Sequence, residues 1–122
     1  MPFLQVSNNA RGNLVLPYTP GDATLTITAG TGALFPQSGT FHVTKWASIY
    51  ETPYEDSNRQ ILEISSITGD VLTISDSTSE GTSDSASLLG ARVALLLTAG
   101  VIQEIQDYVT TYAVTGATGI AG

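Results

Sequence analysis

The residues that could perform acid–base or metal chemistry are few in this 122-residue chain. His42 is the only histidine and there is no cysteine, so neither a thiolate nucleophile nor a thiolate metal site is available. A single histidine in a strand-like segment is far more often a packing or surface residue than the base of a catalytic triad. We therefore expect no enzymatic activity and no cofactor.

Four carboxylates follow one another later in the chain, at Asp70, Asp76, Glu80 and Asp84. Their spacing lacks the Asp-x-Asp-x-Asp-Gly order of a calcium loop. A solvated acidic loop accounts for them better than a metal site, and a weak cation site is the alternative. The Gly-Thr-Gly at residues 30–32 lacks the third glycine and the following helix of a dinucleotide fingerprint, so we expect a loop there.

Three large aromatic residues, Trp46, Tyr50 and Tyr54, recur at intervals of four. If the strand face that carries Trp46 and Tyr50 is outside, the rings could stack on a sugar or fill a partner's pocket. Packing under a helix or against a neighbouring subunit is the alternative, and the usual location of large aromatic residues favours it. These three residues are the candidate partner or receptor contacts.

The charge balance excludes one class of partner. Eleven acidic residues against four basic ones give a net charge of -7, which repels a phosphate backbone, so we expect no nucleic-acid binding. The most apolar run, residues 88–102, is interrupted by glycine and arginine and is too short to span a bilayer. The N-terminus lacks the basic start and long apolar core of a signal peptide. We expect a soluble protein made in a cytoplasm, with no membrane partner.

Alternating apolar and β-branched residues predict a mainly β chain. Lys45 falls on the apolar face of its strand, which predicts a snorkelling stem or a β-bulge. The polar loop 75–87 has no apparent means of burying itself. We expect a small antiparallel β-sandwich or barrel followed by one C-terminal α-helix. The predicted strands cover residues 23–29, 40–50, 59–67, 71–75 and 88–97, with a tight hairpin at 68–70. We expect the last of these strands to be heavily buried.

Thr98 predicts the N-cap of a helix from residue 99 to about residue 112. Apolar residues recur along it with a 3,4,3 spacing and form a stripe on one side. Two heptads do not prove a coiled coil, and the helix alone favours packing on its own sheet. The stripe, our candidate oligomer interface, consists of Ile102, Ile105, Val109 and Tyr112.

The C-terminal tail makes contact between the helices of several chains more favoured than the helix alone does. Gly116, Gly119 and Gly122 recur at every third position, as a collagen triple helix requires because only glycine fits at its axis. A helix followed by such a tail indicates a homotrimer, and the simplest interpretation is the start of a longer fibrous polypeptide or one cut there. We divide the chain into an N-terminal arm or hairpin (1–21), a β-domain (22–97), a helix and candidate trimeric coiled coil (98–114) and a collagen-like stub (115–122).

Four segments of the chain occur together in a known order. They are the ATLTITAGTGALFPQSGTFHV run from Ala23, then ITGDVLTI, then EGT, then LTAG opening the helix. This combination resembles a small β-rich module of tail-fibre, spike and other structural proteins of tailed bacteriophages, over about two-thirds of the chain. The module's pattern also has an Arg early in the polar loop and a His before the next strand. Here the loop has no Arg and Ser87 stands at the His position, so contacts through those two residues are not carried over.

The resemblance, the helix and the tail together imply a structural virion protein. The implied role is the N-terminal anchoring module of a trimeric tail or head fibre, which attaches the fibre to other virion structural proteins. The expected location is the virion, after synthesis in the host bacterial cytoplasm. The alternative function is a module that binds a host-surface glycan or protein through the three aromatic residues.

Overall fold

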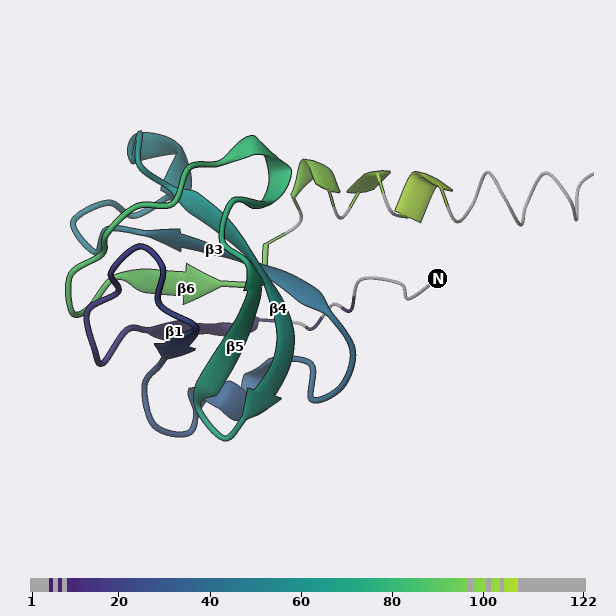
Figure 1. The fold of residues 1–122 in the computed structure, drawn as a ribbon, viewed down its shortest axis with the longest axis horizontal. Helices are drawn as coiled ribbons and strands as arrows, with labels where there is room; N and C mark the ends of the chain where they lie inside the picture. The colour runs from purple at the N-terminus through teal and green to yellow at the C-terminus, as the bar shows by residue number, and fades with distance from the viewer. Residues whose placement is uncertain are drawn as a thin grey trace, which may run out of the picture.

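The computed structural model describes residues 5, 7, 9–96, 98–100, 102, 103 and 105–107. The main feature of this part of the chain is one antiparallel sheet with the strand order β1-β6-β3-β4-β5-β2 (Figure 1). Short 3₁₀ turns lie in the loops between strands. The strands are β1 (Arg11–Asn13), β2 (Thr24–Thr26), β3 (Phe41–Trp46), β4 (Gln60–Thr68), β5 (Val71–Asp76) and β6 (Arg92–Ala94), and the turns are η1 (Thr31–Leu34), η2 (Pro53–Glu55) and η3 (Ser79–Gly81).

The sheet curls until its two edge strands meet. Leu14 and Ile27, the residues that follow β1 and β2, form an antiparallel bridge. Beside it, the Thr28 N–H donates to the Asn13 carbonyl at 2.9 Å. Such curling covers sheet edges that would otherwise expose unpaired backbone groups. The predicted class, mainly β followed by a helix, is confirmed, and of the two predicted architectures the chain forms the curled, half-barrel one.

The apolar core fills the inside of the curled sheet. Alternation along the strands explains it, since Leu62 and Ile64 of β4 are buried while Glu63 between them is partly exposed. Phe35 closes one side of the core, with its ring centroid 6.0 Å from that of Phe41. The loop after β2 therefore folds back on the core. The core residues are Ala10, Leu14, Tyr18, Leu25, Ile27, Phe35, Phe41, Val43, Leu62, Ile64, Leu72, Ala91 and Val93.

The sheet begins earlier in the chain than the boundary placed at residue 22. β1 pairs with β6 in the register Gly12↔Val93. Tyr18 is buried and exchanges two backbone hydrogen bonds with Ser87, each 2.9 Å long. From residue 10 onwards, the segment assigned to an arm or hairpin is therefore an edge of the β-domain. We use "β-domain" below for residues 10–96.

Three predicted strands are longer than the strands that form, since β2 covers only Thr24–Thr26 of the predicted 23–29. β3 ends at Trp46 rather than at residue 50, and β6 begins at Arg92 rather than at residue 88. Leu88 and Leu89, expected in a buried strand, are exposed. Because Trp46 pairs with Arg92, both shortened ends lie at the same end of the sheet. The predicted hairpin between β4 and β5 is confirmed.

The polar loop after β5 is not simply solvated, in contrast to the prediction. Asp84 accepts hydrogen bonds through Oδ1 from the Tyr18 hydroxyl at 2.7 Å and from Gln60 Nε2 at 3.0 Å. Its Oδ2 accepts from the Gly21 N–H and the Ser77 hydroxyl, both at 3.2 Å. Burial raises the pKa of Asp84, but these hydrogen bonds together outweigh burial and hold that pKa below its usual range. The ionised Asp84 side chain thus connects the loop by hydrogen bonds to the N-terminal edge of the sheet and to β4.

A second carboxylate joins the β4–β5 hairpin to the loop after β2. Asp70 Oδ1 accepts from the Gly32 N–H at 2.8 Å, and the Gly30 N–H lies 3.1 Å from both carboxylate oxygens. Gly32 has to be glycine here, because a Cβ at this position would collide with the carbonyl oxygen of Gly69. The ITGD and TAGTG segments, separate in the sequence, are therefore hydrogen-bonded neighbours.

The helix begins where expected. The Thr98 carbonyl accepts from the Ile102 N–H at 2.9 Å, which places Thr98 at the N-cap, and helical residues are described up to residue 107. Figure 1 shows this segment leading away from the curled sheet. Ile102 and Ile105 are 40% and 36% exposed, so the described part of the helix does not pack on its own sheet, contrary to what the helix alone favoured. Val109, Tyr112 and the stub 115–122 lie outside the described residues.

We predict that Asp70→Asn lowers the free energy of unfolding by about 2 kcal/mol, because the Gly30 and Gly32 N–H groups lose a charged acceptor. Urea denaturation followed by the fluorescence of Trp46, the only tryptophan, measures this loss. Asp22→Asn is the control, since Asp22 is exposed and accepts one backbone hydrogen bond, from Thr19 at 2.9 Å. Equal stability of Asp70→Asn and the parent chain would contradict the prediction.

Candidate functional site

The start of the helix and the candidate contact residue Trp46 lie at opposite ends of β3. β3 and β6 are antiparallel with Trp46 opposite Arg92, so the chain that leaves β6 for the helix runs towards the His42 end of β3. His42 and Trp46 are roughly 13 Å apart along the strand. We call the end with His42, Glu80, Thr98 and Gly100 the helix pole. We call the end with Trp46, Ile49, Tyr50, Leu88 and Leu89 the hollow pole.

At the helix pole, the Glu80 carboxylate joins the sheet to the start of the helix. Its Oε2 lies 2.7 Å from His42 Nδ1 and accepts from the Thr98 hydroxyl at 2.6 Å. Its Oε1 accepts from the Gly100 N–H at 2.5 Å. Burial raises the pKa of Glu80, but the hydrogen bonds from Thr98, His42 and Gly100 outweigh burial and hold that pKa below its usual range. An ionised carboxylate from η3 therefore caps a helix in another part of the chain.

His42 is held between two carboxylates. Its Nδ1 faces Glu80, and its Nε2 lies 3.4 Å from Glu63 Oε1. Because each ring nitrogen faces a carboxylate, His42 has no free nitrogen with which to activate a nucleophile. This geometry favours a structural role for the histidine.

The four carboxylates considered as cation ligands instead accept hydrogen bonds within the protein. Asp76 Oδ1 accepts from the Thr78 N–H at 2.9 Å. Asp70, Glu80 and Asp84 accept from the donors described above. Within the described part of the chain, no group of three or more acidic or histidine side chains is arranged to hold a metal ion.

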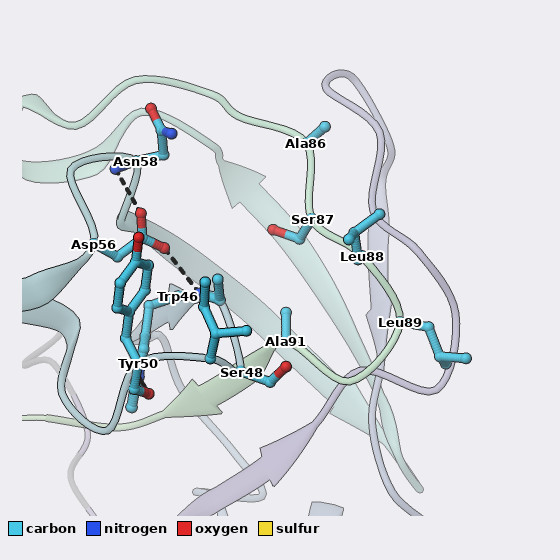
Figure 2. A pocket seen from close by; sticks show the side chains of 12 residues that line it. Trp46, Ser48, Tyr50, Asp56, Asn58, Ala86, Ser87, Leu88, Leu89 and Ala91 are labelled. Carbon is cyan, nitrogen blue, oxygen red and sulfur yellow. Dashed lines mark hydrogen bonds between the residues drawn. The ribbon is translucent and has the colours of Figure 1, made fainter.

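The hollow pole carries a hollow of about 320 Å³ between the turn after β3 and the segment before β6 (Figure 2). Its size is near the lower end for small-molecule sites. Asp56 shapes one wall: Oδ2 accepts from the Ala47 N–H and Oδ1 from the Asn58 N–H, each at 2.8 Å. Figure 2 shows Leu88 and Leu89 on the opposite side. Together with Ile49 they give the hollow a largely exposed aliphatic rim.

The structure brings two of the three candidate aromatic residues together at this hollow. Trp46 Nε1 donates to the Tyr50 carbonyl at 3.1 Å, and both residues line the hollow. Trp46 is only 7% exposed, so its ring offers little surface for stacking on a sugar. Tyr54 is 85% exposed but lies on η2 and does not line the hollow. The most exposed hydrophobic side chains that line the hollow are therefore aliphatic.

Sequence reasoning missed both the aliphatic rim and Glu80. The rim was missed because residues 88–97 were expected to form a buried strand. Glu80 was counted as part of a solvated acidic loop. The available signal was the joint occurrence of the EGT and LTAG segments, which the structure connects through Glu80, Thr98 and Gly100.

Lys45 does not line the hollow, but it contacts Ser87, which does, and it is only 1% exposed. Its Nζ donates to the Ser85 carbonyl at 3.1 Å and to the Ser87 hydroxyl, and lies 4.8 Å from the Tyr18 ring centroid. Lys45 stays in register opposite Gln60, so neither the predicted bulge nor a stem that snorkels to solvent is present. Through these hydrogen bonds the enclosed amine fixes the position of the segment that contains Ser85 and Ser87. Ser87 is one of the residues that line the hollow.

The environment of Lys45 changes its protonation. Burial lowers the pKa of Lys45 to about 8, although the charges of Asp84 and Asp56 oppose this shift. Nearby, burial and the hydrogen bond to Asp84 raise the pKa of Tyr18 to about 12. Both groups therefore titrate outside their usual ranges.

No protein-family model matches the chain, and no curated protein matches it significantly. None of the helical residues described belongs to a helix long and apolar enough to cross a membrane.

We predict that the free energy of unfolding rises by about 1–2 kcal/mol between pH 8 and pH 10. In this range the unfolded chain, with an ordinary Lys45 pKa of 10.5, keeps a proton that the folded chain has released, so stability increases with pH. Above pH 10 the sign reverses, because unfolded Tyr18 ionises near 10.0 while folded Tyr18 stays protonated up to about 12.

Urea denaturation at several pH values, for the parent chain and Lys45→Met, measures this effect. The variant keeps most of the side-chain volume but has no amine, so its stability should lack the rise between pH 8 and pH 10. The same rise in both proteins would show that Lys45 is not its source.

Proposed function

We propose that this chain is a structural bacteriophage virion protein, the N-terminal anchoring module of a trimeric tail or head fibre. In this proposal the β-domain attaches the fibre to other virion structural proteins. The helices of three copies meet on one axis and continue into the fibre shaft. The role requires no catalysis, since three-fold avidity strengthens the attachment.

The observation that carries the proposal is the exposed apolar side of the helix. Ile102 and Ile105 stand one helical turn apart on a helix that leads away from the β-domain, and neither joins the core. An apolar stripe in this position loses contact with water only when another chain covers it. The glycine spacing at 116, 119 and 122 supports three as the number of copies.

The arrangement of the two poles supports the direction of attachment. The helix starts at the helix pole, and the hollow pole is at the other end of β3. In a fibre whose shaft follows the helix, the hollow pole faces away from the shaft. This is the side on which an anchoring module would meet other virion structural proteins.

We predict that the parent chain sediments as a trimer and that Ile105→Asp sediments as a monomer. In a trimer, the Asp side chain would be an unpaired charge buried between the helices. Burying such a charge costs roughly several kcal/mol. Sedimentation equilibrium over a wide concentration range measures the mass of each protein. Gln106→Asp places the same charge one residue further on, outside the stripe, and should remain trimeric. A trimer of Ile105→Asp, or a monomeric parent chain, would contradict the proposal.

The hollow supports the alternative function, a module that binds a host-surface glycan or protein. Its aliphatic rim of Ile49, Leu88 and Leu89 fits an apolar side chain of a protein better than a sugar ring. The buried position of Trp46 further weakens the case for glycan stacking. This position also makes Trp46→Ala a poor test, because removing a core tryptophan destabilises a fold by about 3–5 kcal/mol.

We predict that the parent chain gives no signal on a glycan array and does not adhere to a panel of bacterial cells. The control variant is Leu88→Ser, since Leu88 is exposed and its replacement leaves the core intact. Binding by the parent chain that Leu88→Ser abolishes would favour the alternative function over the proposed one.

A further inference from the structure

The connection between the β-domain and the helix is made by the side chain of Glu80. Three donors from two distant segments converge on it: the His42 ring from β3, and the Thr98 hydroxyl and Gly100 N–H from the helix start. The segment from residue 95 to the N-cap is the covalent link between β6 and the helix. A short link alone fixes a distance but leaves many directions open. The carboxylate adds contacts that fix a direction.

Two backbone features are arranged around this contact. Glu80 has a φ of +54° and a ψ of +32°, a left-handed conformation that side-chain-bearing residues rarely adopt. Backbone in this region persists where surrounding contacts hold it, and such positions are frequent at functional sites. At the other end of the contact, a Cβ at Gly100 would collide with the Glu80 carboxylate. The helix start therefore approaches the carboxylate as closely as it does only with glycine at this position.

Burial raises the pKa of Glu80, but hydrogen bonds from Thr98, His42 and Gly100 lower it by more and favour its ionised form at this contact. His42 faces Glu80 from β3, and Glu63 of β4 faces the other ring nitrogen of His42. The pKa of Asp76, at the end of β5, is also lowered: hydrogen bonds from Thr78 and Ser79 and the charge of His42 together outweigh its burial. His42 is thus in contact with two carboxylates, those of Glu63 and Glu80, and Glu80 is the one that also reaches the helix.

We propose that Glu80 is the positioning residue that sets the direction in which the helix leaves the β-domain, by clamping Thr98 and Gly100 to His42. The inference rests on the proposed function only in the purpose that we assign to the clamp. That purpose is to present the apolar stripes of three chains to a common axis. The clamp itself is a property of one chain. Its loss leaves the stripe intact but frees the angle between helix and β-domain.

Distances between two spin labels test this directly, because the chain has no native cysteine. We place one label at Ser66 in β4 and the other at Gln106 on the helix, both exposed, and dilute labelled chains with unlabelled ones so that each oligomer holds one labelled chain. The parent chain should give one narrow distance distribution. Glu80→Gln, which removes the charge at nearly constant shape, should broaden that distribution at least twofold.

Two further variants separate positioning from general damage. Gly100→Ala leaves the Glu80 charge in place but obstructs its approach, so it should also broaden or shift the distribution. Glu55→Gln changes an exposed glutamate in another 3₁₀ turn, η2, and should match the parent chain. Trp46 fluorescence, at the opposite end of β3, shows that the β-domain of each variant is folded.

A narrow distribution in Glu80→Gln identical to that of the parent chain would overturn the proposal. So would a parent distribution as broad as that of the variant. Sedimentation of the same samples keeps this outcome distinct from the proposed function: trimers with an unchanged angle in Glu80→Gln refute the clamp alone. Monomers with a narrow parent distribution and a broadened variant refute the trimeric fibre and leave the clamp standing.

Discussion

Hydrogen bonds from backbone N–H groups and neutral side chains to buried or half-buried carboxylates hold the loops of this β-domain in place. With eleven acidic and only four basic residues, the chain has too few cations to pair with its carboxylates. In the described part of the chain, the salt bridges found involve His42 alone. Asp70 and Glu80 instead accept from glycine N–H groups of distant segments, and charge-assisted bonds of this kind are stronger than neutral ones. An acidic composition is in this way compatible with well-fixed loops.

The same interactions explain why four sequence segments occur together. The Asp70 of ITGD requires the glycines of TAGTG, since its carboxylate binds the N–H groups of Gly30 and Gly32. The Glu80 of EGT requires Thr98 and Gly100 of LTAG for the same reason. Each pair is a physical unit with a carboxylate on one side and a closely approached glycine on the other. This dependence is a property of the chain itself.

Local patterns were enough to predict the β class, the hairpin at residues 68–70 and the N-cap at Thr98, because each depends on residues close in sequence. The ends of strands and the fate of polar side chains could not be predicted in this way. Lys45 is buried because Ser85, Ser87 and Tyr18, far away in sequence, enclose its amine. The segment at residues 88 and 89 looks like a strand, but it turns at the end of the sheet and leaves its leucines exposed. Tertiary contacts decide such positions.

Hydrogen exchange of the Gly32 and Gly100 amides tests the central claim most directly. Neither N–H belongs to a strand pairing, and Gly100 lies in the first helical turn, where an N–H has no partner within the helix. If Asp70 and Glu80 bind them, both amides should exchange far more slowly than in an unfolded chain, at rates similar to those of the neighbouring strand amides. Exchange of either amide at the unprotected rate, in a chain whose strand amides are protected, would contradict the account.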